Sequence, residues 1–115
     1  MLPYKNRFHG HSSLDYVYKN GQAYRSRLVT IKTTPNKVRK DSRIAVVVGK
    51  KVLKSAAKRN LIRRRIYEYL RINMARLNSV SDIVVIVLAS EVYTTSYDDL
   101  TKALNELMVQ AGLVK

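Results

Sequence analysis

Three segments of the chain repeat apolar residues at the three- and four-residue spacing of an amphipathic helix. They are residues 12–20, 55–77 and 96–112. The third segment carries signals at both ends, since Ser96 stands three residues before an aspartate and Gly112 closes the pattern. The sequence therefore predicts three helices, each with one apolar face.

Runs of β-branched and aromatic residues between these helices favour strands. Residues 24–34 end at a Pro-Asn turn signal, and residues 44–48 and 83–88 are continuous apolar runs typical of buried strands. The predicted order is helix, two or three strands, helix, strand, helix. One sheet covered by helices accommodates this order, so the predicted fold class is an α+β two-layer sandwich.

The length of 115 residues suits one hydrophobic core, so we expect residues 1–115 to form a single domain with a ragged N-terminus over about residues 1–11. The chain has no cysteine, which excludes disulfides and thiolate metal sites. Its longest apolar run, residues 83–89, is far shorter than the roughly 20 residues that span a bilayer. The N-terminus lacks a secretory apolar core, so a cytoplasmic protein without a membrane partner is the simplest interpretation.

Positive charge is concentrated in one part of the sequence. Lys and Arg number 22 against 8 Asp and Glu, which gives a net charge of +14. Residues 37–76 hold 14 of the 22 basic side chains and only two acids, Asp41 and Glu68. Such an excess opposes compaction unless an anion lies against it, so we expect a polyanionic partner.

The helix predicted over residues 55–77 separates apolar from charged side chains. Ile62, Ile66 and Leu70 fall in its apolar sector. The opposite sector collects polar, basic and aromatic residues, namely Asn60, Arg63, Arg64, Tyr67 and Arg71, while Lys58 and Arg65 line one flank. Guanidinium groups pair bidentately with phosphate, and an amide and an aromatic ring beside them suit RNA.

Three lysines stand just before or at the start of this helix. They are Lys50, Lys51 and Lys54. Backbone N–H groups at a helix N-terminus already favour anions, so these lysines are predicted to contact phosphates. The predicted ligand of the whole segment is an RNA backbone.

Candidate catalytic groups are scarce. His9 and His11 have a spacing that holds a metal only weakly, and Asp98 and Asp99 fit the favourable position of acids at a helix start. VVVGKK lacks the upstream glycine and the Ser or Thr of a phosphate-binding loop. The chain therefore offers no predicted catalytic residue and no predicted metal site.

These motifs resemble the protein component of bacterial ribonuclease P. VVVGKKVLKSAAKRNLIRRRIYEYLR is similar to the family's buried strand, Lys-Lys pair, basic loop and helix with an Arg-Asn-Arg signature. LDYVYKNGQAYRSR, SDIVVIVLA and SYDDLTKALNELMVQAGL are similar to its other segments, so the likeness covers residues 6–113. The chain departs from the pattern at Leu14, Gly49, Leu61 and Tyr67, and Leu61 replaces the second Arg of the signature.

The resemblance implies a fold and a function. The fold would be an α-β sandwich, similar to the second domain of ribosomal protein S5, with a left-handed β-α-β crossover against the general right-handed rule. The chain would be the RNA-binding subunit of an endoribonuclease holoenzyme whose catalytic RNA removes the 5′ leader from precursor tRNA. Its partners would be ribonuclease P RNA and precursor tRNA, with no small-molecule substrate. The RNA would hold most of the required Mg²⁺, and no side chain of the protein would be catalytic.

The resemblance also assigns Arg59, Asn60, Arg63 and Arg64 to contacts with the catalytic RNA. Together with the charge pattern, the predicted contact set is Lys50, Lys51, Lys54, Lys58, Arg59, Asn60, Arg63, Arg64, Arg65, Tyr67 and Arg71. A cleft between the first helix and the sheet would take the single-stranded leader, lined by Leu14, Tyr18, Tyr24, Arg25 and Lys32. An aromatic floor with a basic rim suits sequence-tolerant binding of a single strand.

Other classes stay open on the sequence alone. KKVLKSAA resembles the helix start of a double-stranded-RNA-binding domain, but that domain ends with this helix, whereas a strand and a helix follow here. A basic RNA-binding or ribosomal-type protein without a processing role is the main alternative. A membrane-surface helix would need to expose the apolar face that the core requires.

Overall fold

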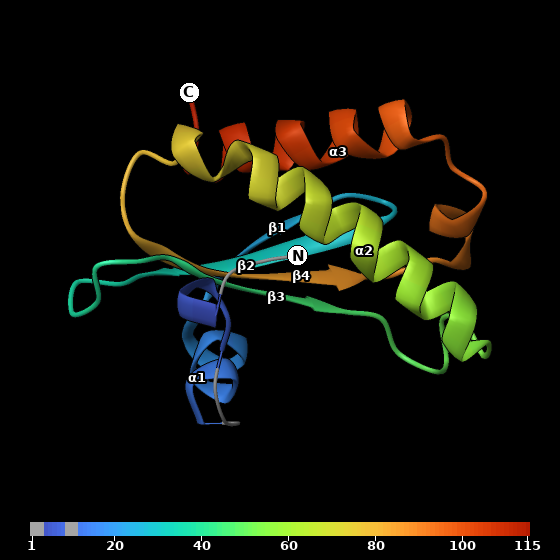
Figure 1. Ribbon diagram of the computed structural model, residues 1–115, viewed down its shortest axis with the longest axis horizontal. Coiled ribbons are helices and arrows are strands. Elements are labelled where there is room, and N and C mark those ends of the chain that lie inside the picture. The colour runs from blue at the N-terminus through green and yellow to red at the C-terminus, as the bar shows by residue number, and fades with distance from the viewer. Residues whose placement is uncertain (1–3, 9–11) are drawn as a thin grey trace.

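Four strands form one mixed sheet in the order β1-β2-β4-β3 in this computed structural model, which describes residues 4–8 and 12–115. The elements in chain order are η1 (Tyr4–Asn6), α1 (Ser12–Asn20), β1 (Gln22–Arg25), β2 (Val29–Pro35), β3 (Arg43–Val47), α2 (Ala56–Asn73), η2 (Met74–Arg76), β4 (Ser81–Val87), η3 (Ser90–Tyr93) and α3 (Tyr97–Gln110). Helices α2 and α3 cover one face of the sheet, and α1 lies on the other (Figure 1). The predicted α+β sandwich is confirmed.

The core fills the space between the sheet and helices α2 and α3. Ile31 of β2, Ile83 of β4 and Ile44 of β3 point to this side, where they meet Ile62 and Ile66 of α2, and all five are at most 1% exposed. Alternate residues of a strand face opposite sides, so the other face carries Lys32 and its neighbours, which contact α1. The two faces of the sheet therefore have different surroundings.

The crossover between the parallel strands runs from β3 through α2 to β4. Strand β3 pairs in parallel with β4, whereas β4 and β1 both pair antiparallel with β2. Because β3 and β4 are neighbours, the connection passes over one face of the sheet and brings α2 across the core. The left hand of this crossover stays a prediction.

The single strand predicted over residues 24–34 is wrong, because the chain folds there into the hairpin of β1 and β2. Ser26 closes the turn: its backbone N–H donates to the Val29 carbonyl at 2.9 Å, and its Oγ accepts from the Val29 N–H at 3.2 Å. Arg27 lies in the turn between the two strands, where it pairs with Glu91.

Residues 4–8 of the N-terminal segment contact the edge of the sheet. Asn6 is buried and donates a hydrogen bond to the Ser42 carbonyl at 2.9 Å, and Arg7 forms a parallel bridge with Ile44 at the free edge of β3. These residues therefore lie against β3, and the extent of a ragged end stays a prediction. The possible His9 and His11 metal pair lies outside the described residues.

A buried ion pair lies on the α1 side of the sheet. Arg43 of β3 and Asp82 of β4 are direct register partners and are 8% and 5% exposed. The guanidinium donates to both carboxylate oxygens, with N–O distances of 3.0 and 2.6 Å, and the Phe8 ring lies 4.9 Å from the Arg43 guanidinium carbon. Asn36 donates a third hydrogen bond to Asp82 at 2.9 Å. The pair and its neighbours thus join four segments of the chain.

Candidate nucleic-acid interface

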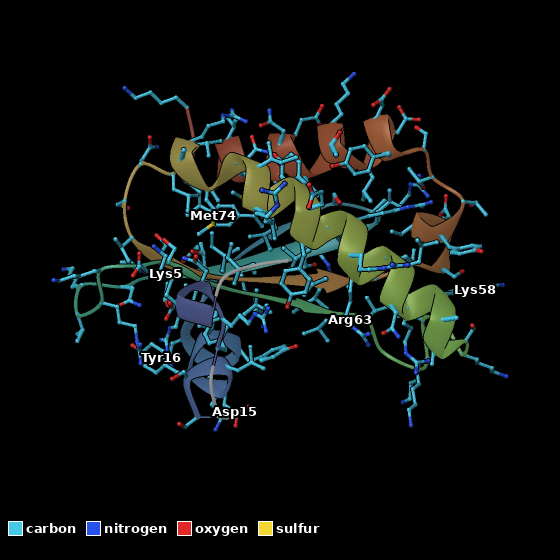
Figure 2. All side chains as sticks on the ribbon, in the orientation of Figure 1. Lys5, Asp15, Tyr16, Lys58, Arg63 and Met74 are labelled. Atoms are coloured by element: carbon cyan, nitrogen blue, oxygen red, sulfur yellow. The ribbon has the colours of Figure 1, made fainter. Side chains whose placement is uncertain are left out.

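Helix α2 turns its basic face outward because its apolar face is fixed in the core. Ser55 caps the helix by accepting a hydrogen bond from the Lys58 backbone N–H at 3.3 Å. From this start, Lys58 and Arg63 follow along α2 as it crosses the sheet (Figure 2). Ile62 and Ile66, both 0% exposed, lie on the side facing the sheet. The predicted division of the helix into an apolar and a basic sector is confirmed.

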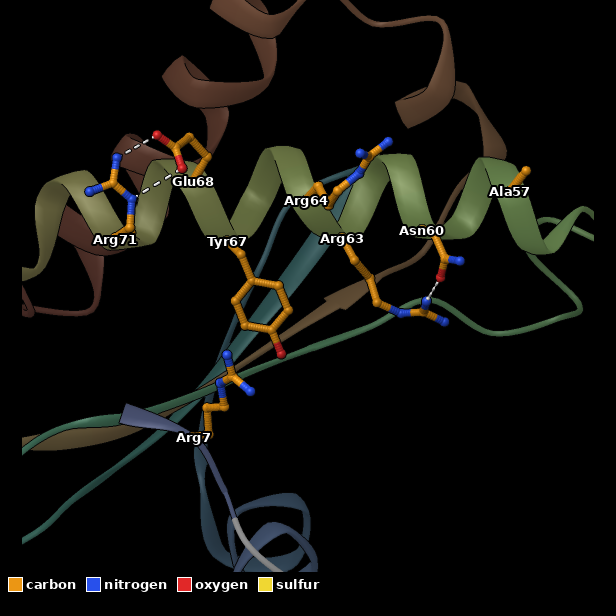
Figure 3. A pocket seen from close by; sticks show the side chains of 8 residues that line it. All are labelled: Arg7, Ala57, Asn60, Arg63, Arg64, Tyr67, Glu68 and Arg71. Atoms are coloured by element: carbon orange, nitrogen blue, oxygen red, sulfur yellow. Dashed lines mark hydrogen bonds and ion pairs between the residues drawn. The ribbon is translucent and has the colours of Figure 1, made fainter. Parts of the chain in front are cut away.

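A groove of about 820 Å³ runs between the outer face of α2 and the N-terminal segment. Figure 3 shows it bordered by α2 on one side and Arg7 on the other. Its lining residues are Arg7, Ala57, Asn60, Arg63, Arg64, Tyr67, Glu68 and Arg71. All five residues predicted for the outer sector of the helix therefore lie on one concave surface.

Hydrogen bonds within the groove fix its aromatic and basic side chains. The Tyr67 hydroxyl accepts a hydrogen bond from the Val46 backbone N–H of β3 at 3.1 Å, which holds the ring against the sheet edge. Arg63 donates to the Asn60 side-chain carbonyl. Arg64 is exposed and makes no ion pair with any residue in the described part of the chain. Arg64 is thus available to an anion.

Glu68 is the acidic member of the groove lining. Its carboxylate accepts two hydrogen bonds from the Arg71 guanidinium, at 2.6 and 3.1 Å. The hydrogen bonds from Arg71 hold the pKa of Glu68 below its usual value and raise the pKa of Arg71. Arg71 is therefore already paired with Glu68, and a phosphate in the groove would compete with this carboxylate for the guanidinium.

The three lysines before α2 are exposed, as an anion-binding role requires. Lys50 and Lys51 lie in a turn in which the Val52 and Leu53 N–H groups donate to the Gly49 carbonyl, at 3.1 and 3.2 Å. Lys54 follows directly before the N-cap. These lysines extend the basic surface from the groove to the N-terminal end of the helix.

Besides the three lysines before the helix, three predicted contact residues on α2 itself do not line the groove. Lys58 stands over the Tyr93 ring of η3, 4.9 Å from its centre, and Arg65 lies two turns along the same flank. Arg59 is 9% exposed and donates hydrogen bonds to the Leu53 and Lys54 carbonyls, each at 2.8 Å. In this structure Arg59 braces the lysine-bearing loop, and direct contact with RNA stays a prediction for all three residues.

The second predicted site lies between α1 and the sheet. The Lys32 ammonium donates to the Tyr18 backbone carbonyl at 3.0 Å and lies 5.5 Å from the centre of the Tyr18 ring. Burial, with a smaller contribution from Asp15, raises the pKa of the Tyr18 hydroxyl. Leu14 is half-buried nearby on the same helix, and Arg25 is exposed on the Lys32 side of the sheet.

Tyr24 is not part of this second site, so its assignment to the cleft is wrong. The hairpin register pairs Tyr24 with Ile31, which places it on the face covered by α2 and α3, where it packs against the core. Lys32 pairs with Ala23 and faces the other way. The error follows from reading residues 24–34 as one strand.

Arg7 and Glu68 are groove residues that the sequence did not reveal. Arg7 reaches the groove through its bridge to Ile44, a contact between segments 37 residues apart for which no local pattern exists. Glu68 could have been predicted from its position. It stands four residues after Arg64 and one after Tyr67, on the outward side of the helix.

Residues 4–8 and 12–115 carry neither a metal cluster nor a helix suited to a membrane. They contain no group of three or more His, Cys, Asp or Glu side chains placed to hold a metal ion. None of their helices has the length and apolar character needed to cross a bilayer.

The sheet, its crossover helix and the groove define a small basic α+β protein with a surface suited to a polyanion. A sequence model of the Ribonuclease P family matches residues 2–112. The chain therefore belongs to the Ribonuclease P family, and it is the RNA-binding subunit of an endoribonuclease that processes tRNA. The resemblance read from the sequence is confirmed, and the alternative without a processing role is set aside.

Named relatives are similar in sequence to this chain over most of their length. Ribonuclease P protein component from Prochlorococcus marinus strain MIT 9301 is 29% identical, over 99% of this chain and 98% of its own length. The same component from strain MIT 9215 is 33% identical over 68% of this chain and 70% of its own length.

Solved structures of two bacterial proteins have the same fold. The Staphylococcus aureus RNase P protein superposes with a TM-score of 0.85, at 23% identity, covering 96% of this chain and 98% of that protein. The Thermotoga maritima RNase P protein gives a TM-score of 0.76, also at 23% identity, covering 88% and 94%. At this identity the likeness supports the fold alone.

Proposed function

We propose that the groove on α2 and the lysine turn before it bind the ribonuclease P RNA, while the face between α1 and the sheet binds the 5′ leader of precursor tRNA. The observation that carries the first part is the gathering of Asn60, Arg63, Arg64, Tyr67 and Arg71 on one concave surface. Arginines spread along a groove suit a backbone with many phosphates better than a small ligand.

The proposed role of the protein is to bind and position RNA. The Mg²⁺ that supports cleavage is assigned to the RNA subunit, because a groove lined by four arginines and one glutamate repels a divalent cation. The assembly is assigned to the cytoplasm. In this account, the side chains supply cations, hydrogen-bond donors and stacking surfaces, and the RNA supplies the reacting centre.

The leader-binding half of the proposal rests on Tyr18 and Lys32. A ring at the helix-sheet junction offers a stacking surface, and the ammonium beside it attracts the backbone of the strand. Because stacking tolerates any base, this face suits leaders of different sequence. Arg25, on the same face of the hairpin as Lys32, extends the cationic rim.

Replacing Tyr18 with Ala is expected to weaken binding of precursor tRNA to the assembled holoenzyme by about 1–3 kcal/mol, the usual value of one base stacked on an aromatic ring. Affinity for mature tRNA and for the catalytic RNA is expected to stay near the unmodified values. Tyr18→Phe is the matched control, since it keeps the ring, and both variants keep the backbone carbonyl that Lys32 contacts.

Equilibrium binding of precursor and mature tRNA to holoenzymes carrying each variant measures this effect. If the unmodified holoenzyme bound precursor and mature tRNA equally, leader binding by the protein would be excluded. An equal loss for both tRNAs in Tyr18→Ala would instead locate the defect outside the leader.

A further inference from the structure

Arg59 is a buried cation at the beginning of a helix, where positive charge is unfavourable. It is the fourth residue of α2 and is 9% exposed. The N-terminal end of a helix carries a partial positive charge, so a guanidinium there is disfavoured unless other contacts compensate. Arg59 forms no ion pair with any residue that the structure describes. Hydrogen bonds therefore have to compensate for its position.

These hydrogen bonds go to the segment that leads into α2. One guanidinium nitrogen of Arg59, Nη1, donates to the Leu53 and Lys54 carbonyls, each at 2.8 Å. Both carbonyls stand before the N-cap Ser55, outside the hydrogen-bonded ladder of the helix. The guanidinium thus fixes two successive peptide groups, through hydrogen bonds that its charge strengthens.

The segment held in this way carries three lysines within five residues. Lys50, Lys51 and Lys54 are exposed, and none of them pairs with an acid in residues 4–8 and 12–115. Like charges at this spacing repel one another, and a flexible lysine loses conformational freedom when it binds a phosphate. A backbone that is already ordered reduces the entropy lost on binding.

Other contacts fix the first part of the segment without Arg59. Val52 and Leu53 pack against the core, and their N–H groups donate to the Gly49 carbonyl at 3.1 and 3.2 Å. The backbone around Lys54, in contrast, is held from the side of the helix by the Arg59 guanidinium. Loss of this guanidinium should loosen the backbone around Lys54 and leave the core in place.

We propose that Arg59 is a positioning residue, which holds the segment before α2 in the conformation in which Lys50, Lys51 and Lys54 bind phosphates of the RNA subunit. This inference rests on the proposed binding of ribonuclease P RNA at these lysines. Arg59 itself neutralises no phosphate, because it is buried and already donates to two carbonyls, whereas Arg64 is exposed in the groove. The contribution of Arg59 to RNA binding therefore passes through the lysines.

The test is a double-variant cycle on the affinity for ribonuclease P RNA, measured at several salt concentrations. Its variants are Arg59→Met, the triple variant Lys50→Gln with Lys51→Gln and Lys54→Gln, and all four changes together. Arg59→Met alone is expected to lower the affinity about 3- to 10-fold. Added to the triple variant, it is expected to change neither the affinity nor the log-affinity against log-salt slope, because the side chains that it positions are gone.

Arg59→Lys separates the charge of Arg59 from its hydrogen bonds, and it takes the place of Arg59→Met in the cycle if the latter does not fold. It keeps the charge on a shorter side chain without the planar fork of the guanidinium. Cleavage of the free chain after Lys54 by a lysine-specific protease reports the order of the segment, and cleavage after Lys102 in α3 is the control. We expect faster cleavage after Lys54 in each Arg59 variant, in step with its loss of affinity, and no change at Lys102.

Three results would overturn the inference. The same loss of affinity from Arg59→Met with and without the three lysines would mean that Arg59 contacts the RNA directly. No loss in either background would leave Arg59 without a role in binding. Full affinity of Arg59→Lys, despite faster cleavage after Lys54, would show that the charge alone is sufficient. The proposed function is tested separately, because a triple lysine variant with unchanged affinity would remove the lysines from the RNA interface whatever Arg59 does.

Discussion

Replacing Arg63 and Arg64 together with glutamine is expected to lower the affinity for ribonuclease P RNA by about 10- to 100-fold and to flatten the salt dependence of binding. Each guanidinium that neutralises one phosphate contributes about 0.7 to 0.9 to the log-affinity against log-salt slope, so the double variant should lose about 1.4 to 1.8. Both side chains line the groove, and glutamine keeps the helix propensity of arginine. Titration of the RNA at several salt concentrations gives both values.

The control for this experiment is Lys102→Gln with Lys115→Gln, which removes the same charge from exposed positions away from the groove. If only the total charge mattered, both double variants would flatten the slope equally. A slope that stays unchanged in the Arg63 and Arg64 variant would remove the outer face of α2 from the RNA interface.

Replacing Asp82 with Ala is expected to destabilise the fold by about 3–5 kcal/mol, the usual cost of leaving a buried charge without its partner. Arg43 is 8% exposed and donates two hydrogen bonds to this carboxylate. In the variant, the buried Arg43 guanidinium is therefore left without its partner. Asn36 loses its hydrogen bond to Asp82 as well. Denaturant unfolding of the unmodified chain and the variant gives the difference in free energy of unfolding.

The double variant Arg43→Met with Asp82→Leu is the informative companion, because it removes both charges. Buried ion pairs replaced by apolar residues of similar volume are often neutral in stability, so this variant should recover most of the loss. If Asp82→Ala alone cost less than about 1 kcal/mol, Arg43 would have to reach water or another anion on unpairing.

Local patterns predicted the helices and the buried strands well. Helix α2 begins at the Ser55 N-cap and α3 at the Ser96 N-cap, and Gly112 takes the positive φ of 73° that follows α3. Capping and periodicity depend on residues close in the sequence, so both can be predicted from the sequence alone. The residues of the outer face of α2 were predicted for the same reason, because once Ile62 and Ile66 are buried the opposite side must face solvent.

Long-range contacts and side-chain direction account for what the sequence missed. The hairpin between β1 and β2 has no Gly, Asn or Pro at its turn, where Ser26 closes it instead, and this error moved Tyr24 to the wrong face. Arg59 is basic and lies on a basic helix, yet its guanidinium turns back to two loop carbonyls. The contribution of Arg7 to the groove depends on its pairing with Ile44, which only the folded chain creates.

The central claim, that this chain acts as an RNA-binding subunit and not as a nuclease by itself, is tested most directly by reconstitution. Purified chain, ribonuclease P RNA and precursor tRNA are combined at a Mg²⁺ concentration at which the RNA alone cleaves slowly. We expect no cleavage by the chain alone, slow cleavage by the RNA alone, and efficient removal of the 5′ leader when the two are mixed. Leader removal by the chain without RNA, or no stimulation of the RNA by the chain, would contradict the account.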